Sequence, residues 1–387
     1  MKIKEIQGFI IKDSRLQDTI GVSLFSFNGF GAKASIPSGK SVGKYEAKVK
    51  SPRVVLNQID LIKKNIKDID FKSPIDFDDF LLKLDGTEDK SNLGANTILA
   101  LSMAFWRLFA IYEKIPLFLL IKKFSNSKEK KFPLLFFNLI NGGVHAKNSL
   151  PFQEYLIIPQ VDSPEEGLKI CFDFIDDLRE YFKNNSIKFS FGDEGGFTIK
   201  GDDPEVGLKI FNDVLGQKKY PIKFGLDVAA SSLPCKFSSN DLFNFYKNFI
   251  EKYPLFSIED PFVEDDFSNF AKLNQEFGRK IWIVGDDLTT TNLKRIEIAQ
   301  QKNAINTVLI KPNQIGSISE SIEAVNLAKK FGFKTIVSHR SGETMDDFIA
   351  DFAFGVGADG LKSGSPLQKE RLAKYKRLIK IEKKYYF

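Results

Sequence analysis

Hydrophobic and polar positions follow two different patterns along this chain of 387 residues. The first part opens with stretches of β-type residues and continues with stretches whose apolar residues lie three or four apart, the spacing of one helix face. The strand-like stretches are 3–12, 19–27 and 32–36, and the helical stretches are 53–67, 77–84 and 96–110. We therefore predict a small α+β domain over residues 1–126, ending within the charged stretch 122–131.

The second part, residues 127–387, repeats one unit: an apolar run that ends in an ionisable residue, followed by a helical stretch. The runs are 221–227, 255–260, 281–287, 306–311, 334–339 and 358–362, and their ionisable ends are Asp227, Glu259, Asp286, Lys311, His339 and Lys362. The ends follow one another at intervals of 32, 27, 25, 28 and 23 residues, the length of one strand plus one helix in a parallel α/β protein. Two earlier runs, 154–159 and 189–193, are interpreted as opening strands. About eight strands in one domain predict an α/β fold of the β/α-barrel type.

The ionisable strand ends predict a shared site. The C-terminal strand ends of a β/α barrel meet at one mouth, so these side chains would face one another. One such residue could simply begin a polar loop, whereas six in succession, of both signs, favour a common pocket. Asp227, Glu259 and Asp286 held close together would repel one another, and a hard divalent cation such as Mg²⁺ relieves that repulsion. The alternative is three unrelated acids, each paired with a lysine.

Lys311 and Lys362 are candidate proton acceptors. A lysine acts as a base only when neutral, which at pH 7 requires its pKa to fall by about 3 units from ~10.4. A second lysine and a metal ion nearby would favour that fall. Such a lysine could take a proton from carbon beside a carboxylate while metal stabilises the product charge. Without a metal, both lysines would be counterions of the acids.

Two glycine-containing loops add candidate groups. Glu194 lies in the stretch 191–197, where glycines let the backbone approach a ligand, and it could serve as a general acid. His145 lies in the glycine loop 141–146. The chain has only two histidines, and the other, His339, ends a predicted barrel strand, so we assign both to the site.

A phosphate site and a lid are also predicted. Arg340 and Ser341 follow a predicted strand and precede a helix, and an arginine with a hydroxyl at a helix N-terminus suits a phosphate. The glycine-rich loop 37–43 is flexible enough to be a lid, and we interpret it as one. It lacks the glycine spacing of a nucleotide P-loop, so we reject that alternative.

Composition narrows the function class. The chain is 43% hydrophobic and 27% charged, as expected for a globular protein. Its formal net charge of +6 is spread along the sequence, which argues against nucleic-acid binding. Only two cysteines, no signal-like start and no run of ~20 apolar residues favour a cytoplasmic protein without a transmembrane segment.

The chain resembles the enolase family over nearly its whole length. The matching stretches occur in the family's order and include 37–39, 84–87, 93–96, 141–143, 153–154, 192–197, 227–230, 257–261, 284–289, 313–316, 338–344 and 362–364. The resemblance implies a Mg²⁺-dependent lyase that dehydrates 2-phosphoglycerate to phosphoenolpyruvate. It also implies a barrel of the enolase type with a smaller N-terminal lid domain.

The resemblance further implies a role for each matching position. Lys311 would take the C2 proton, and Glu194, assisted by Glu154, would protonate the departing C3 hydroxyl. Asp227, Glu259 and Asp286 would bind a first Mg²⁺, and Ser41 would touch a second one that arrives with substrate. The positions implied in substrate binding or closure are Gln153, Lys362, His339, Arg340, Ser341 and His145.

Departures from the family pattern indicate a divergent, shortened member. Gly21 stands where an acidic residue is expected, and Lys380 and Lys383 stand where an arginine and a glutamate are expected. The family uses these positions between subunits, so a homo-oligomer is expected with altered dimer contacts. About a dozen residues are missing after Ala47.

Two alternatives remain open from the sequence. One is a related barrel enzyme that abstracts a proton beside another carboxylate. The other is a weakly active or inactive paralogue that acts as a binding or surface protein.

Overall fold

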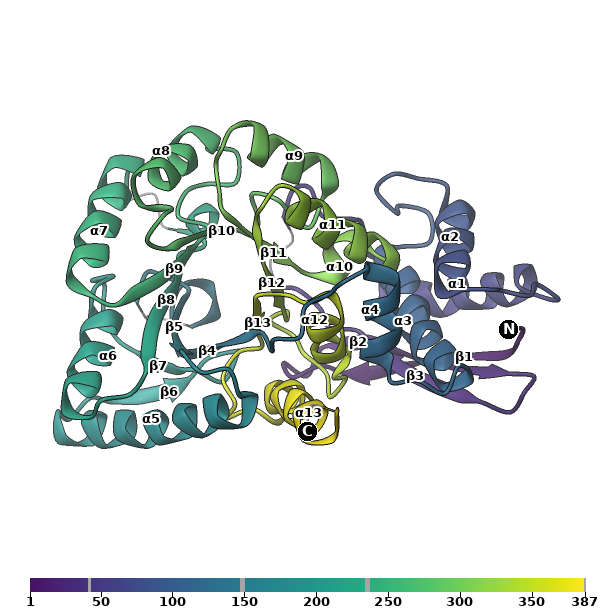
Figure 1. Cartoon of the computed structure of the whole chain (residues 1–387), viewed down its shortest axis with the longest axis horizontal. Helices are drawn as coiled ribbons and strands as arrows, with labels where there is room; N and C mark the ends of the chain where they lie inside the picture. The colour runs from purple at the N-terminus through teal and green to yellow at the C-terminus, as the bar shows by residue number, and fades with distance from the viewer. Residues whose placement is uncertain (41–42, 147–149, 234–236, 386–387) are drawn as a thin grey trace.

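The computed structural model describes residues 1–40, 43–146, 150–233 and 237–385. Its N-terminal part contains an antiparallel sheet in the order β1-β2-β3, followed by four helices, and lies on one side of the barrel (Figure 1). The strands are β1 (Ile3–Lys12), β2 (Asp18–Ser26) and β3 (Gly31–Ser35), and the helices are α1 (Pro52–Asn65), α2 (Pro74–Asp85), α3 (Ala95–Tyr112) and α4 (Leu117–Ser125). All the predicted N-terminal elements are present, and α4 is an additional helix.

Local chemistry explains the bounds of α2. The Ser73 hydroxyl accepts a hydrogen bond from the Asp76 N–H, and the Asp76 carboxylate accepts one from the Ser73 N–H, which caps the helix start. The helix ends at Gly86, whose φ of 70° places it in the left-handed region that glycine favours.

Helix α3 is the core helix of the N-terminal domain. By length and composition alone it could cross a membrane, but 78% of its 18 residues are buried inside the protein. It packs against β2, β3 and α2. An apolar helix that is buried on all sides needs no membrane to explain its composition.

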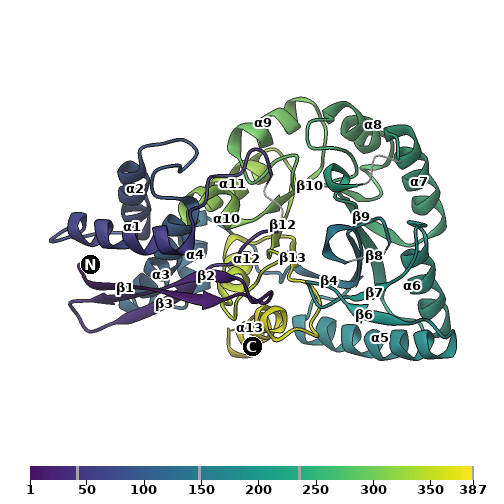
Figure 2. The same ribbon diagram turned by 180° about the vertical axis from the view of Figure 1, so that it is seen from behind.

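The second part is a closed barrel of eight strands with helices outside it, as Figure 2 shows from behind. The strands are β4 (Leu134–Asn141), β5 (Glu154–Pro159), β8 (Ile222–Asp227), β9 (Leu255–Glu259), β10 (Trp282–Gly285), β11 (Thr307–Ile310), β12 (Lys334–Ser338) and β13 (Gly360–Lys362). Pairing of β13 with β4 closes the ring. The helices are α5 (Pro164–Asn184), α6 (Val206–Gln217), α7 (Ser239–Lys252), α8 (Phe267–Phe277), α9 (Leu293–Gln301), α10 (Pro312–Ile315), α11 (Ile318–Lys330), α12 (Phe348–Val356) and α13 (Lys369–Tyr385). The β/α-barrel prediction is confirmed.

The opening of the barrel differs from the sequence prediction. The first barrel strand is β4, which the sequence interpretation did not identify. The run 189–193 contains β6 (Phe189–Phe191), which pairs with β7 (Phe197–Ile199) in a hairpin beside β4 rather than in the ring. Strand β5 runs antiparallel to both neighbours, β4 and β8, so the barrel is not wholly parallel.

The reversed strand still delivers its polar end to the mouth. Because β5 is antiparallel, its first residue, Glu154, pairs with the last residues of its neighbours, Asn141 and Asp227. Side chains two apart on a strand share a face. Glu154 therefore faces the same way as Leu156, a member of the small apolar cluster that fills the barrel interior below the mouth.

Candidate active site

The barrel mouth brings most of the predicted residues together. One cavity there is lined by the side chains predicted from the sequence as catalytic, metal-binding or substrate-binding, namely Gln153, Glu154, Glu194, Asp227, Asp286, Lys311, His339, Arg340, Ser341 and Lys362. Glu259 joins the group through its contact with Lys362. Ser41 lies outside the described residues. His145 belongs to a short 3₁₀ helix, η1 (Gly143–His145), and its side chain lies outside what the structure describes.

Lys362 lies among three carboxylates. Its Nζ is 2.7 Å from Glu259 Oε2, 3.0 Å from Asp227 Oδ2 and 3.2 Å from Glu154 Oε2. Burial alone would lower the pKa of Lys362, but the neighbouring carboxylates raise it well above its usual value. Lys362 is therefore an ammonium ion that neutralises part of the acidic mouth.

Lys311 forms an ion pair with Asp286, whose other oxygen accepts a hydrogen bond of 2.9 Å from Gln314 Nε2. Burial alone would raise the pKa of Asp286 and lower that of Lys311. The ion pair outweighs burial and shifts both pKa values in the opposite directions, with Asp286 lowered and Lys311 raised. In this arrangement the pKa of Lys311 lies on the wrong side of its usual value for a base at neutral pH. This is the counterion arrangement that the sequence predicts for Lys311 when no metal is bound.

The acids have the donor chemistry of a magnesium site. Asp227 and Glu259 are direct neighbours on adjacent strands, and Asp286 follows the next strand, β10. Glu259 Oε1 is buried and accepts no hydrogen bond within the described residues. Burial and the Asp227 charge raise the pKa of Glu259 to about 8. An orphaned oxygen in an all-oxygen set fits a hard dication.

The three predicted metal ligands nevertheless do not share one partner in this structure, because two of them contact Lys362 and the third contacts Lys311. Asp227 and Glu259 contact Lys362, and Asp286 contacts Lys311. Two other groups among the described residues have ligand atoms within 4.8 Å of one another: Glu154, Glu194 and His339, and Asp260, Asp286 and Asp287. Asp260 and Asp287 were not predicted as site residues, although each directly follows a predicted metal ligand in the chain.

Asp260 fixes the backbone that carries the proposed metal ligand Asp286. Its carboxylate accepts hydrogen bonds from the backbone N–H groups of Asp286 (2.9 Å) and Asp287 (2.7 Å). Both carboxylate oxygens are thereby engaged, which fixes the loop after β10. Burial and the Asp286 charge raise the pKa of Asp287 to about 7. The excess of acids at this end of the mouth is a further reason for a cation there.

Glu194 is held by two side chains. Asn138 Nδ2 donates to Glu194 Oε2 at 3.1 Å, and His339 Nε2 lies 3.5 Å from the same oxygen. Glu154 lies close by, and burial together with the Glu194 charge raises the pKa of Glu154 well above its usual value. Asn138 was not predicted, because it lies inside a strand rather than at its end. The arrangement suits a carboxyl group that delivers a proton.

Two glycines near Glu194 pack closely against Asn141. A Cβ atom at Gly192 or Gly196 would lie 2.7 Å or 2.6 Å from the Asn141 side chain. Gly196 N–H donates to Asn141 Oδ1 at 3.0 Å. These contacts with Asn141 connect the Glu194 loop to the end of β4.

Arg340 and Ser341 are held by the N-terminal domain. Arg340 makes a two-pronged contact with Glu46, with donor–acceptor distances of 2.9 Å and 3.2 Å. Ser341 Oγ accepts hydrogen bonds from Lys40 N at 2.8 Å and from Arg15 Nη1 at 3.1 Å. The predicted helix directly after Ser341 is absent, since α12 begins only at Phe348. The arginine and hydroxyl remain suited to a phosphate, but without a helix N-terminus.

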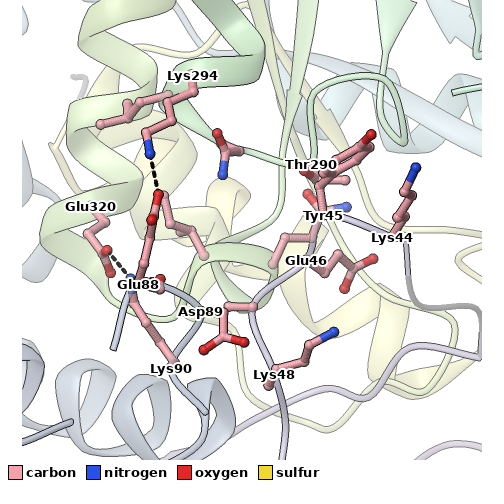
Figure 3. Close-up of a pocket in the computed structure, with 15 residues that line it drawn as sticks. Lys44, Tyr45, Glu46, Lys48, Glu88, Asp89, Lys90, Thr290, Lys294 and Glu320 are labelled. Carbon is pink, nitrogen blue, oxygen red and sulfur yellow. Dashed lines mark hydrogen bonds and ion pairs between the residues drawn. The ribbon is translucent and has the colours of Figure 1, made fainter. Parts of the chain in front are cut away.

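Two missed residues join the loops over the mouth. Lys40 Nζ contacts Asp193 Oδ2 and Val144 O, each at 2.8 Å, and so connects the lid base to the loops of Glu194 and His145. Glu46 lines both the mouth and a second cavity of about 430 Å³, which Figure 3 shows. Ion pairs line this second cavity: Lys90 with Glu320 at 2.6 Å, and Lys294 with Glu88. No local sequence pattern marks Lys40 or Glu46 as part of the site.

Comparisons with known proteins agree with this geometry. Residues 3–121 match the family described as "Enolase, N-terminal domain", and residues 129–385 match "Enolase, C-terminal TIM barrel domain". The chain is 38% identical over 404 residues to the enolase of Elusimicrobium minutum, covering 98% of this chain and 96% of the relative. It is 38% identical over 421 residues to enolase B of Dictyostelium discoideum (99% and 95%) and 38% identical over 420 residues to the enolase of Solanum lycopersicum (98% and 95%). Each similarity spans nearly the whole of both proteins.

Proposed function

The chain belongs to the enolase family, and from that membership we propose how its residues carry out the enolase reaction. The reaction is the reversible removal of water from 2-phosphoglycerate to give phosphoenolpyruvate, a step of glycolysis and gluconeogenesis. The enzyme is thus a hydro-lyase that depends on a divalent metal. The residue roles below are our proposal.

Lys311 accepts the proton from C2, and Glu194 donates a proton to the departing C3 hydroxyl. Lys311 follows β11 and Glu194 lies beside β4, strands that are separated by β12 and β13 around the ring. A substrate between them can lose its proton on one side and its hydroxyl on the other. Glu154, with its raised pKa, assists Glu194 by sharing the proton. His145 closes over the substrate from the loop after β4.

The substrate is held at its two charged ends. Arg340, Ser341 and His339 bind the phosphate, for which Arg340 must exchange part of its contact with Glu46. Lys362 and Gln153 hold the remaining oxygens. Gln153 Nε2 lies 3.1 Å from Asp227 Oδ2, which places its amide next to the metal ligands.

Asp227, Glu259 and Asp286 would hold a first Mg²⁺, and Ser41 would be a ligand of a second one bound together with substrate. When bound, Mg²⁺ supplies positive charge against the negative charge that develops on the substrate carboxylate. Asp286 is both a proposed ligand and the partner of Lys311. A cation bound by Asp286 would take up part of that carboxylate's charge and would thereby favour the neutral form of Lys311 that a base requires.

The observation that carries this proposal is the convergence of both lysines with Asp227, Glu259 and Asp286 at one mouth. Its test is the growth of ultraviolet absorbance from phosphoenolpyruvate when 2-phosphoglycerate and Mg²⁺ are added. We expect activity with Mg²⁺ and its loss after chelation with EDTA. Folded protein that gives no signal would instead support a binding paralogue.

We propose the boundary between the lid domain and the barrel domain after residue 126. Helix α4 ends at Ser125 and β4 begins at Leu134, so the boundary lies in the connection. Limited proteolysis tests this boundary. Cleavage between Ser125 and Leu134 supports it, and first cleavage inside an element of either domain contradicts it.

We also propose a cytoplasmic homo-oligomer with altered subunit contacts and no nucleic-acid partner. A Cβ atom at Gly21 would lie 2.3 Å from the Phe9 ring, so the acidic residue that the family pattern implies there would require this ring to move. Lys383 pairs with Glu165 of the same chain at 2.5 Å. Light scattering on the purified protein gives the oligomeric state, and a monomer at micromolar concentration contradicts the proposal.

A further inference from the structure

We propose that Arg371 is a positioning residue that holds the His339 ring in the tautomer with its proton on Nε2. The inference rests on the proposed roles of Glu194 and His339. Arg371 lies in the first turn of α13, outside the barrel ring, and its side chain is fully buried. No local sequence pattern connects it with the site.

The guanidinium of Arg371 contacts neutral groups only, within the part of the chain that the structure describes. It donates to the backbone carbonyls of Arg340 (2.7 Å) and Ser341 (2.7 Å) and to that of Asp193 (3.4 Å). Gln368 Oε1 accepts from its Nε at 3.2 Å. Burying an arginine without a carboxylate partner costs free energy. The carbonyls that accept its hydrogen bonds belong to the proposed phosphate-binding residues and to the residue before Glu194.

The remaining contact sets the histidine tautomer. Arg371 Nη1 meets His339 Nδ1. A guanidinium can only donate hydrogen bonds, so Nδ1 must be the acceptor and the proton of the neutral ring lies on Nε2. Nε2 faces Glu194 Oε2 at 3.5 Å. The Nε2–H is thereby directed at the proposed acid and at the space where substrate binds.

Burial keeps this ring neutral. The pKa of His339 is lowered well below its usual value, first by burial and further by the nearby Arg371 and Lys362 charges, against the opposing Glu194 charge. A neutral ring has one donor and one acceptor nitrogen. The opposite tautomer would place an N–H against the Arg371 guanidinium and a lone pair against the Glu194 carboxylate. Both contacts are repulsive.

The backbone around this contact leaves room for it. Gly364 has a φ of 75°, and a Cβ atom there would lie 3.0 Å from Arg371 Cδ and 3.1 Å from His339 Cε1. The same Cβ would lie 3.2 Å from Glu194 O. A glycine at this position therefore lets the guanidinium, the imidazole and the Glu194 loop pack against one another.

The direct test is ¹⁵N NMR of histidine-labelled enzyme without substrate, which reports the protonated ring nitrogen. Because the chain has two histidines, the variant His145→Gln leaves His339 as the single signal. We expect the Nε2–H form at neutral pH. A ring protonated on Nδ1 overturns the proposal, whether or not the enzyme makes phosphoenolpyruvate, so its failure is distinguishable from failure of the proposed function.

Variants separate positioning from stability. Arg371→Met removes the donors at similar length and is expected to mix the tautomers and lower kcat roughly 10–100-fold, as loss of an orienting partner commonly does. Arg371→Lys keeps a cation beside Nδ1 and is expected to retain more of the Nε2–H form and more of kcat. An unchanged tautomer in Arg371→Met contradicts the proposal.

Arg377→Met is the matched control. Arg377 lies in the same helix, but its guanidinium contacts Asp351 at 2.6 Å and 2.7 Å, away from the mouth. We expect Arg377→Met to lower the urea midpoint while leaving the His339 tautomer and kcat unchanged. If it shifts the tautomer as Arg371→Met does, the effect belongs to α13 in general and the assignment to Arg371 is wrong.

Discussion

At the scale of single residues, the protonation of each buried group in the mouth depends on the neighbour that it faces. Lys311 and Lys362 stay protonated because each faces a carboxylate, and Asp286 stays ionised because it faces Lys311. Truncating one member leaves its partner buried and unpaired, which is more costly than the pair itself. Any substitution here therefore changes the protonation of its neighbour as well as removing a group.

The assignment of base and acid leads to one prediction. Lys311→Ala should abolish exchange of the C2 proton with solvent, because no other group is proposed to accept that proton. Glu194→Gln should keep part of this exchange, because the acid acts on the hydroxyl at C3. Deuterium loss from C2-labelled 2-phosphoglycerate, followed by NMR, measures both. Equal loss of exchange in the two variants would mean that the roles are wrongly assigned.

Sequence spacing located these residues but not their partners. The strand-end positions followed from the period of apolar runs, which local sequence carries. The pairing of Glu46 with Arg340 joins positions 294 apart, and Asn138 contacts Glu194 from inside a strand. Such contacts depend on how whole elements pack, so no local pattern could predict them.

At the scale of elements, the loop after β10 is strained where it supports Lys311. Thr290 and Thr291 have φ values of 45° and 56°, uncommon for β-branched residues. The Thr291 hydroxyl accepts from Lys311 N at 2.9 Å and donates to Gln314 Oε1 at 2.7 Å. Gln314 in turn donates to Asp286. The strained loop thus connects the proposed base to a proposed metal ligand.

Replacing Thr291 tests this link. Thr291→Val keeps the shape but leaves the Lys311 N–H and Gln314 Oε1 without a partner, which costs about 1–3 kcal/mol for a buried group. We expect a lower urea midpoint and a lower kcat. Thr291→Ser, which keeps the hydroxyl, is the control and should retain most of both. If the two variants behave alike, the hydroxyl does not position Lys311.

Strand direction is the feature of these elements that local sequence patterns do not predict. Alternation and length identify strands, but neither states whether a strand runs with or against its neighbour. The reversal of β5 is set by its pairing with β4 and β8 in the folded barrel. Glu154 nevertheless lies at the mouth, because a reversed strand begins at the face where its neighbours end.

At the scale of the whole molecule, buried polar contacts join the two domains. The Asp78 carboxylate of α2 accepts from Trp106 Nε1 and from the Ser319 backbone N–H of α11, each at 3.0 Å. Arg107 of α3 contacts Asp346 beyond the barrel strand β12 at 2.6 Å and 2.8 Å. The N-terminal domain is thus fixed to the barrel by residues that do not line the mouth.

Asp78 makes this junction sensitive to pH. Burial raises the pKa of Asp78 from 3.8 to about 6, against the opposing hydrogen bonds. A raised carboxyl pKa means that the folded state binds more protons than the unfolded state, so this contribution to stability falls as pH rises through 3.8 to about 6. The full fall amounts to roughly 3 kcal/mol.

Asp78→Asn removes the titration and keeps an acceptor for Trp106 and Ser319. Relative to the unchanged protein, the variant should gain roughly 3 kcal/mol in unfolding free energy between pH 4 and pH 8. Urea unfolding, followed by fluorescence of the buried Trp106, measures the difference at each pH. A constant difference would show that Asp78 does not take up a proton on folding in this range.

The closure of the ring between β4 and β13 has a consequence for synthesis. The first and last barrel strands are joined only when Gly360–Lys362 has been made, and Arg371 follows still later. A chain still emerging from the ribosome therefore carries a complete lid domain and most of its acids, but has no closed mouth. Catalytic ability therefore arises in one late event, and a nascent chain that stalls before this point is left with an acidic barrel that lacks its closing strand.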